Sequence, residues 1–133
     1  TTGVSVTVAT NATNGWTAWV KDTNSGLLSS QSANYTIPSS VYSSSATSTL
    51  SPGTEAYLLW GASGTGSPSI DTGYAGSSTT GGGLSPTFQR IAYSSNPTGN
   101  QQFTLKEIAA ISGTTPAGSD YTDTITVVGA GNF

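Results

Sequence analysis

The sequence predicts an all-β protein, a single antiparallel β-sandwich of about seven strands that spans residues 1–133. Apolar and polar residues alternate with a period of two near both ends of the chain, as they do in strands that bury one face. Turn-forming residues, mainly Gly, Asn and Pro, separate the apolar segments at short intervals. Helical spacing of apolar residues is not convincing anywhere, so we expect a fold without helices.

The N-terminal region predicts two strands joined as a hairpin. Val4–Val8 alternates β-branched apolar residues with polar ones. Trp16–Lys21 alternates in the same way and begins directly after Asn14 and Gly15, a dipeptide whose tolerance of positive φ favours a tight hairpin turn. We therefore expect the two strands to pair with each other.

The middle of the chain combines short apolar segments with serine-rich loops. Short strands are expected around three apolar positions, Leu27, Ile37 and Tyr42. Glu55–Trp60 is the most continuously apolar run and predicts a central strand. Gly61–Gly83 is rich in glycine and lacks periodicity, which predicts a long loop that is interrupted near Ile70.

Three more strands are expected in the last third of the chain. Phe88–Tyr93 is the first of them, and Tyr121–Val128 is the last. Phe103–Ile111 contains a segment with some helical character, but we interpret it as a strand. Its apolar residues change face between Leu105 and Ile108, and one inserted residue, a β-bulge, would produce that change.

Composition excludes several classes of partner. Charged residues make up 7% of the chain, against about 25% in a typical domain, and about a third of the residues are Ser or Thr. The cations are Lys21, Arg90 and Lys106, and the net charge is -3, so the chain lacks the basic patch that nucleic acid binding requires. Its apolar runs are also far shorter than the roughly 20 residues of a spanning helix.

The chemistry of the side chains favours an extracellular location. Cys, Met and His are absent, so the chain has no disulfide and no easily oxidised side chain. The abundance of hydroxyl groups and the scarcity of charge are typical of an exported surface protein. The chain begins at Thr1 without Met or an apolar leader, and we read it as a mature or trimmed product.

The sequence does not predict an enzyme, a metal site or a cofactor site. A serine hydrolase needs an activating base, usually His, and the chain has none, while a Ser-Lys dyad stays formally open. Asp120 and Asp123 would point to opposite faces of a strand, which favours turn or capping roles over a catalytic pair. A calcium site built on Asp120 and Asp123 is the weaker alternative, because no Asp-x-Asp loop is present.

Aromatic residues and sequons supply the remaining candidate sites. Trp16 and Trp19 fall on opposite faces of one strand, so we expect one in the core and one at the surface. Three aromatic residues are candidates for a subunit interface or for stacking on sugar rings, namely Trp19, Tyr35 and Tyr42. Asn11 and Asn34 each begin an N-glycosylation sequon.

The lysines allow one covalent alternative. Lys21 or Lys106 could form an intramolecular isopeptide bond to an Asn such as Asn132, but nothing in the spacing selects such a set, and solvated lysines are the simpler interpretation.

Two stretches resemble a known family. Thr115–Val127 carries a Pro-Ala-Gly turn that leads into Tyr121-Thr122-Asp123, and it resembles the closing pattern of spore coat protein U domains and archaic chaperone-usher pilins. Val4–Val20 resembles their central hairpin, and its Thr-Asn-Ala-Thr-Asn-Gly run is similar to repeats of bacterial surface proteins. The resemblance implies an immunoglobulin-like, pilin-like sandwich, export, and polymerisation by donor-strand exchange.

The sequence departs from that family in two respects. The pilins carry a further N-terminal strand with a donor segment, and often a cysteine in the hairpin, and this chain has neither. Its fold is therefore either closed differently or completed by another chain.

These observations lead to two hypotheses about function. In the first, the chain is a structural subunit of an extracellular filament, pilus or surface layer, a homopolymer in which residues 1–9 act as a donor strand through Val4, Val6 and Val8. In the second, it is a monomeric carbohydrate-binding or adhesin domain of a larger surface protein, with glycans as its ligands.

Overall fold

The computed structural model describes residues 3–63 and 67–133. Residues 1–2 of the expected donor strand and 64–66 of the expected loop lie outside them. The strands assigned are β1 (Val4–Thr10), β2 (Trp16–Lys21), β3 (Gly26–Ser29), β4 (Tyr35–Pro38), β5 (Ser48–Thr49), β6 (Thr54–Ser63), β7 (Ser69–Ile70), β8 (Thr80–Gly81), β9 (Gln89–Ser94), β10 (Thr98–Ala110) and β11 (Thr126–Gly131), with a 3-10 turn, η1 (Thr72–Tyr74).

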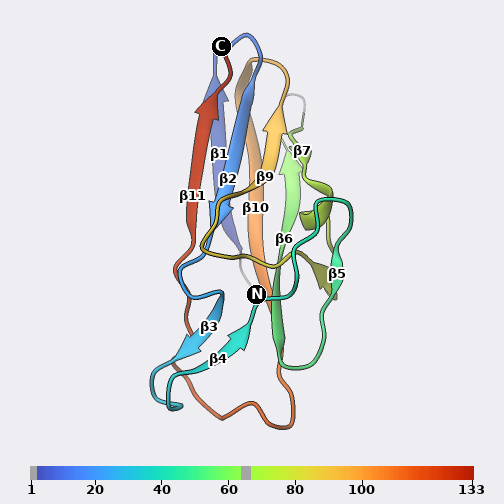
Figure 1. Cartoon of the computed structure of the whole chain (residues 1–133). Coiled ribbons are helices and arrows are strands. Elements are labelled where there is room, and N and C mark those ends of the chain that lie inside the picture. The colour runs from blue at the N-terminus through green and yellow to red at the C-terminus, as the bar shows by residue number, and fades with distance from the viewer. Residues whose placement is uncertain (1–2, 64–66) are drawn as a thin grey trace.

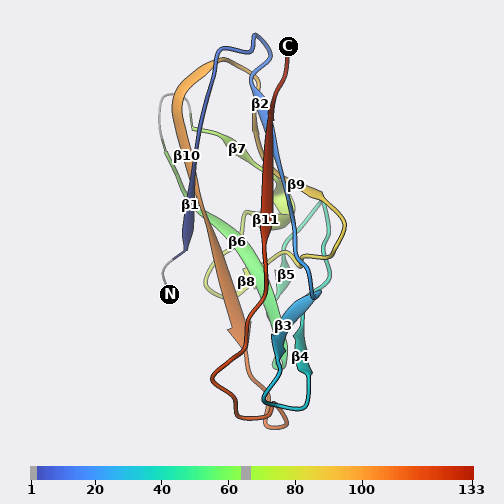
Figure 2. The same ribbon diagram turned by 90° about the vertical axis from the view of Figure 1, so that its left-hand side faces the viewer.

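Two main sheets face each other across one core (Figures 1 and 2). One sheet has three strands in the order β1-β10-β6, and the other has four in the order β11-β2-β9-β7. Among the described residues the two main sheets contain seven strands, and the two short pairs β3-β4 and β5-β8 bring the total to eleven, against the expected number of about seven. All the strand pairings are antiparallel, so the predicted all-β antiparallel sandwich is confirmed.

The core lies between the two sheets because β2 and β10 bury alternate residues. Trp16, Ala18 and Val20 are buried on β2, while Trp19 on the opposite face is only half-buried. The Trp16 ring stacks on Phe103 of β10 with 6.1 Å between the ring centroids. The indole nitrogen of Trp16 donates a hydrogen bond of 2.7 Å to Gln101, which satisfies the one polar atom of a fully buried ring.

The predicted hairpin between the first two strands is wrong. β1 pairs with β10 in one sheet, whereas β2 is occupied on both edges by β11 and β9 in the other. The tight turn at Asn14 and Gly15 does form, because the Gly15 amide donates to Ala12 at 3.0 Å and Gly15 adopts a φ of 75°. This turn carries the chain across from one sheet to the other, which a period-two pattern cannot distinguish from a hairpin.

The bulge predicted between Leu105 and Ile108 is also wrong. The register between β10 and β6 is regular from Thr104 to Ala110, and the irregularity lies between Gln102 and Thr104. The prediction brought the apolar residues Leu105 and Ile108 to one face by means of an inserted residue. By its position in the alternation, Glu107 instead shares the inward face with Phe103 and Leu105.

Two other expectations from the middle of the chain are confirmed. Glu55–Trp60 lies within β6, whose residues from Glu55 to Leu59 are all buried. The expected interruption near Ile70 is β7, which pairs with β9. None of the helical segments in the described part of the chain is long and apolar enough to cross a membrane.

Candidate functional site

Three carboxylates meet at the end of the sandwich that lies beside β3 and β4. Asp22 directly follows β2, Glu55 is the second residue of β6, and Asp123 stands three residues before β11 (Figure 1). One oxygen from each of the three lies within 4.8 Å of the others. We call these three residues the carboxylate cluster.

Hydrogen bonds from several segments position the carboxylate cluster. The Asp22 amide donates to Ser85 at 3.1 Å, which fixes the chain as it leaves β2. Ser39, just after β4, donates its hydroxyl to Glu55 Oε1 at 3.0 Å. Asp123 Oδ1 accepts from the amides of Thr124 at 2.7 Å and Asn24 at 3.3 Å, which ties the segment before β11 to the turn after β2.

The other four oxygens of the cluster are buried without a hydrogen-bond partner in the described residues. Within the described residues this holds for both oxygens of Asp22, for Glu55 Oε2 and for Asp123 Oδ2. Asp22 is 1% exposed and Glu55 is 0% exposed. Buried polar atoms are nearly always paired in folded proteins, so a group of unpaired oxygens at one point is unusual.

The same point holds an unpaired hydroxyl. Tyr57 is two residues after Glu55 on β6, shares its inward face, and is 0% exposed. Its hydroxyl has no hydrogen-bond partner in the described residues. The charges that act on this hydroxyl are those of Glu55, Glu107 and Asp123, so Tyr57 reaches the cluster.

Burial and mutual repulsion dominate the electrostatics of the cluster. Burial, and then the neighbouring charge of Glu107, raise the pKa of Glu55 to about 8. Burial and then Asp123 raise the pKa of Asp22. Burial also raises the pKa of Glu107, which faces Tyr57 across the β10-β6 pair. The two charged side chains that act most strongly on Glu55, Glu107 and Asp123, are both acidic.

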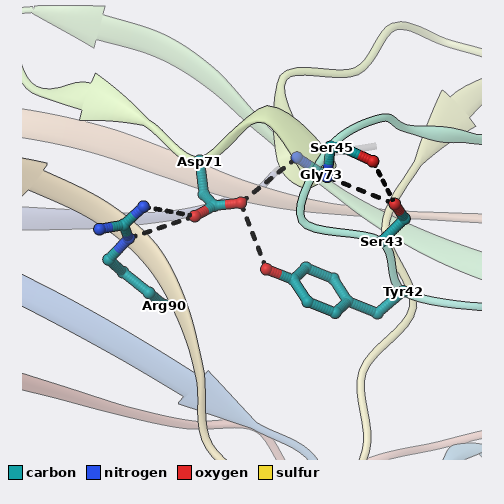
Figure 3. Close-up of polar contacts among 6 residues, drawn as sticks. All are labelled: Tyr42, Ser43, Ser45, Asp71, Gly73 and Arg90. Carbon is teal, nitrogen blue, oxygen red and sulfur yellow. Dashed lines mark hydrogen bonds and ion pairs between the residues drawn. The ribbon is translucent and has the colours of Figure 1, made fainter.

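Asp71 is another buried carboxylate in the same molecule, and both of its oxygens have hydrogen-bond partners. Its Oδ2 accepts from Arg90 Nε at 3.2 Å and Nη2 at 3.1 Å, and its Oδ1 accepts from the Tyr42 hydroxyl at 3.2 Å and the Gly73 amide at 3.4 Å (Figure 3). This arrangement joins η1 to β9 and to the loop after β4. It is a structural anchor, because its charge is neutralised by the chain itself.

No protein-family model, no curated protein and no solved structure matches this chain. The assignment of a function therefore depends on the residues themselves.

The residues expected to form a donor strand lie on β1. Val6 and Val8 are half-buried and pack against the core, while Val4 is 69% exposed. β1 is the outer strand of its sheet, and β11 is the outer strand of the other. Both run along the same flank of the sandwich, the left-hand side of Figure 1 and the facing side of Figure 2.

The structure does not bring the three candidate aromatic residues together. Trp19 lies with Phe88 and Val128 around a shallow apolar hollow of about 310 Å³. Tyr42 stacks on Tyr74 with 5.2 Å between the ring centroids, and its hydroxyl is taken by Asp71. Tyr35 is half-buried on β4.

The two sequon asparagines are both exposed. Asn11 lies just after β1, and Asn34 lies just before β4 with a φ of 60°. Asn tolerates this left-handed conformation better than most residues, which is a sufficient structural reason for its presence at position 34.

The lysine-to-asparagine alternative finds no support at Lys21. The Lys21 ammonium lies 5.1 Å from the centre of the Phe88 ring. The Asn132 amide donates to Thr17 at 3.2 Å, at the opposite end of β2. The two side chains are therefore separated by most of the length of that strand.

Asp120 and Asp123 have different roles. Asp120 accepts from Ser30 at 3.0 Å and from the Gln31 amide at 2.9 Å, which anchors the turn after β3, as the expected turn role requires. Asp123 instead joins Asp22 and Glu55, two residues that the sequence did not associate with it. A polar residue at the start of the most apolar run, Glu55, was the one available signal.

Proposed function

We propose that this chain is a structural subunit of an extracellular filament, pilus or surface layer that assembles by β-strand complementation along the flank formed by β1 and β11. The observation that carries the proposal is that both strands at this flank are open edges without the usual protection. Globular proteins normally block such edges with Lys, Pro or inward-pointing charges, because unpaired backbone groups recruit another strand. Neither Val4–Thr10 nor Thr126–Gly131 contains a charged residue or a proline.

The inner faces of both edge strands are incompletely covered. Val6 and Val8 on β1, and Val127 on β11, pack against the core but stay half-exposed. A strand from a second subunit would cover apolar area on these residues and pair with free backbone groups at the same time. This combination supports assembly along the flank in preference to other faces.

Donor-strand exchange is the form of assembly that we favour. β1 contacts the rest of its sheet through β10 alone. The β1 strand of a second copy could therefore take its place beside β10 and make the same contacts in trans. Val4, Val6 and Val8 would then be the donor residues.

The immunoglobulin-like, pilin-like identity of the sandwich is part of this proposal. The Tyr121 hydroxyl donates to the Pro116 carbonyl at 2.8 Å, five residues upstream. Such a tyrosine corner recurs in immunoglobulin-like sandwiches. The Pro-Ala-Gly turn and the tyrosine that suggested the family are thus in direct contact.

A pair of engineered cysteines tests the exchange. Ser5 on β1 and Thr104 on β10 are register partners, and their hydroxyl oxygens lie 3.0 Å apart at the surface. The chain has no cysteine of its own, so S5C/T104C gives one defined disulfide. We expect filaments in negative-stain microscopy and, after oxidation, a ladder of covalent oligomers on a non-reducing gel.

The outcomes separate the forms of assembly. Filaments whose oxidised subunits run as covalent monomers would mean that β1 stays in its own chain and that exchange is wrong. Dispersed particles at every concentration, for the wild type as well as for the single variants S5C and T104C, would reject the filament proposal.

The second candidate function is glycan binding, and the hollow at Trp19 is the observation that favours it. Exposed aromatic faces stack on sugar rings, and here Trp19 lies beside Phe88, which is 43% exposed, and Val128, which is 44% exposed. Trp19→Ala should abolish binding on a glycan array while Tyr35→Ala leaves it unchanged. Equal binding by both variants would reject this site.

A further inference from the structure

We propose that Asp22, Glu55 and Asp123 bind one calcium ion that joins the two sheets of the sandwich. The proposal is separate from filament assembly, because the carboxylate cluster lies inside the molecule and not on its open flank. It is carried by the geometry of the oxygens, by an unpaired hydroxyl beside them and by the signs of the neighbouring charges.

The spacing of the oxygens fits a single calcium ion. Calcium takes six to eight oxygen ligands at about 2.3–2.6 Å, so two of its ligands can stand up to about 5 Å apart. The three carboxylate oxygens all lie within 4.8 Å of one another. One ion could therefore contact all three without rearrangement of the backbone. Magnesium fits less well, because it prefers shorter contacts of about 2.0–2.1 Å and retains several waters.

An independent observation is the Tyr57 hydroxyl. This side chain is 0% exposed, and its hydroxyl reaches Glu55 from β6 without a hydrogen bond of regular geometry in the described residues. Asp22 is 1% exposed, and both of its oxygens are unpaired. Unpaired buried polar groups call for an explanation such as an ion, and these groups converge on the point that the carboxylates surround.

Acidic neighbours dominate the electrostatics of Glu55 in the described part of the chain. The two charged side chains with the largest effect on its pKa are Glu107 and Asp123, both acidic. Arg90 is engaged by Asp71, and the Lys21 ammonium lies over the Phe88 ring. A divalent cation would supply the charge that Arg90 supplies to Asp71.

The ion would link segments that are far apart in the sequence. Asp22 follows β2 and Asp123 precedes β11, two strands of the four-stranded sheet, while Glu55 belongs to β6 in the three-stranded sheet. Binding should therefore stabilise the packing of one sheet on the other. A ligand that binds only the folded state raises the melting temperature in proportion to the logarithm of its concentration.

Thermal unfolding of the full chain in chelator, calcium or magnesium tests the proposal. We expect Tm to rise with calcium concentration and to rise little with magnesium. Isothermal titration calorimetry should give one site per chain. Terbium, which replaces calcium at oxygen sites, should show luminescence sensitised by Tyr57 that calcium displaces.

Asp22→Asn is the decisive variant, and Asp120→Asn is its matched control. D22N removes one ligand and one buried charge, so it should weaken calcium binding at least about tenfold. It should also unfold at a Tm equal to or above that of the wild type in chelator, because it relieves repulsion. D120N removes a surface charge that already has hydrogen-bond partners, so the calcium response should stay intact.

Three results would overturn the proposal. The first is a wild-type Tm that is the same in chelator and in calcium. The second is a response to magnesium alone. The third is a loss of stability in chelator for both D22N and Glu55→Gln, because it would mean that the carboxyl groups are held by shared protons. If D22N does not fold, E55Q provides the same comparison.

Discussion

Arg90 and Asp71 form a charge pair in which both the Nε and the Nη2 of the arginine donate to one carboxylate oxygen, at 3.2 and 3.1 Å. The aspartate is 5% exposed, while half of the arginine side chain is exposed. The arginine also lies over the Tyr93 ring, 4.6 Å from its centroid. The buried Asp71 therefore depends on Arg90 to neutralise its charge, whereas the exposed Arg90 can be solvated by water.

This asymmetry predicts the effect of removing the arginine. Arg90→Met should reduce the free energy of unfolding by about 1–3 kcal/mol, because it leaves a buried carboxylate without its cation. Asp71→Asn combined with R90M should recover part of the loss, since no buried charge remains. Urea denaturation of the wild type, R90M and the double variant measures both effects. Lys21→Met is the control for loss of a surface cation, and a loss as large as that of R90M would contradict the argument.

Asp120 predicts a dependence of stability on acid. Hydrogen bonds from Ser29 and then from the Gln31 amide lower the pKa of Asp120 to about 2. A carboxylate with a lowered pKa stabilises the fold above its unfolded pKa of about 3.8, and this contribution is lost as the pH falls from there toward about 2. D120N should therefore remove part of the decline in stability over this range. A difference in the free energy of unfolding between wild type and D120N that stays the same at every pH would contradict the prediction.

The alternation of apolar and polar residues predicts well which face of a strand is buried. It predicts poorly which strands pair with each other. It placed Trp16 and Trp19 on opposite faces of one strand, and the structure buries Trp16 and leaves Trp19 half-buried. It could not tell that β1 pairs with β10, because Val4–Val8 would fit equally well beside any open strand. The partner was fixed by contacts about a hundred residues away, such as Val6 with Phe103.

The carboxylate cluster could not be predicted from the sequence for the same reason. Its members stand at positions 22, 55 and 123, and each is local to a different turn or strand end. Calcium motifs that can be read from sequence place their ligands within one loop. The bulge prediction, which rested on the apolar residues Leu105 and Ile108 alone, failed because the regular alternation places Glu107 on the inward face.

We predict that the stability of the fold depends strongly on having glycine, which has no side chain, at position 15. A Cβ there would lie 2.1 Å from the Ser94 carbonyl oxygen, and the residue has a φ of 75°. Gly15→Ala should therefore lower stability by more than about 1 kcal/mol, because both the contact and the backbone conformation oppose it. Gly99→Ala is the matched control, since a Cβ at that position meets nothing within 4 Å. Denaturation midpoints that shift equally for the two variants would contradict this account of the turn.

The two edge strands predict different responses to an added charge. Thr7 on β1 and Ala130 on β11 are both exposed, and lysine is a common protector of sheet edges. If subunits pair edge to edge along β1, Thr7→Lys should suppress filaments in negative-stain microscopy while leaving the thermal unfolding of the subunit nearly unchanged, whereas exchange of β1, which makes the same contacts in trans, should tolerate this lysine. Ala130→Lys should have a smaller effect, and Thr13→Lys, in the exposed turn after β1, controls for charge alone. Suppression by A130K but not by T7K would mean that subunits pair through β11 and not through β1. The reason is that an edge that is not used for pairing tolerates a lysine.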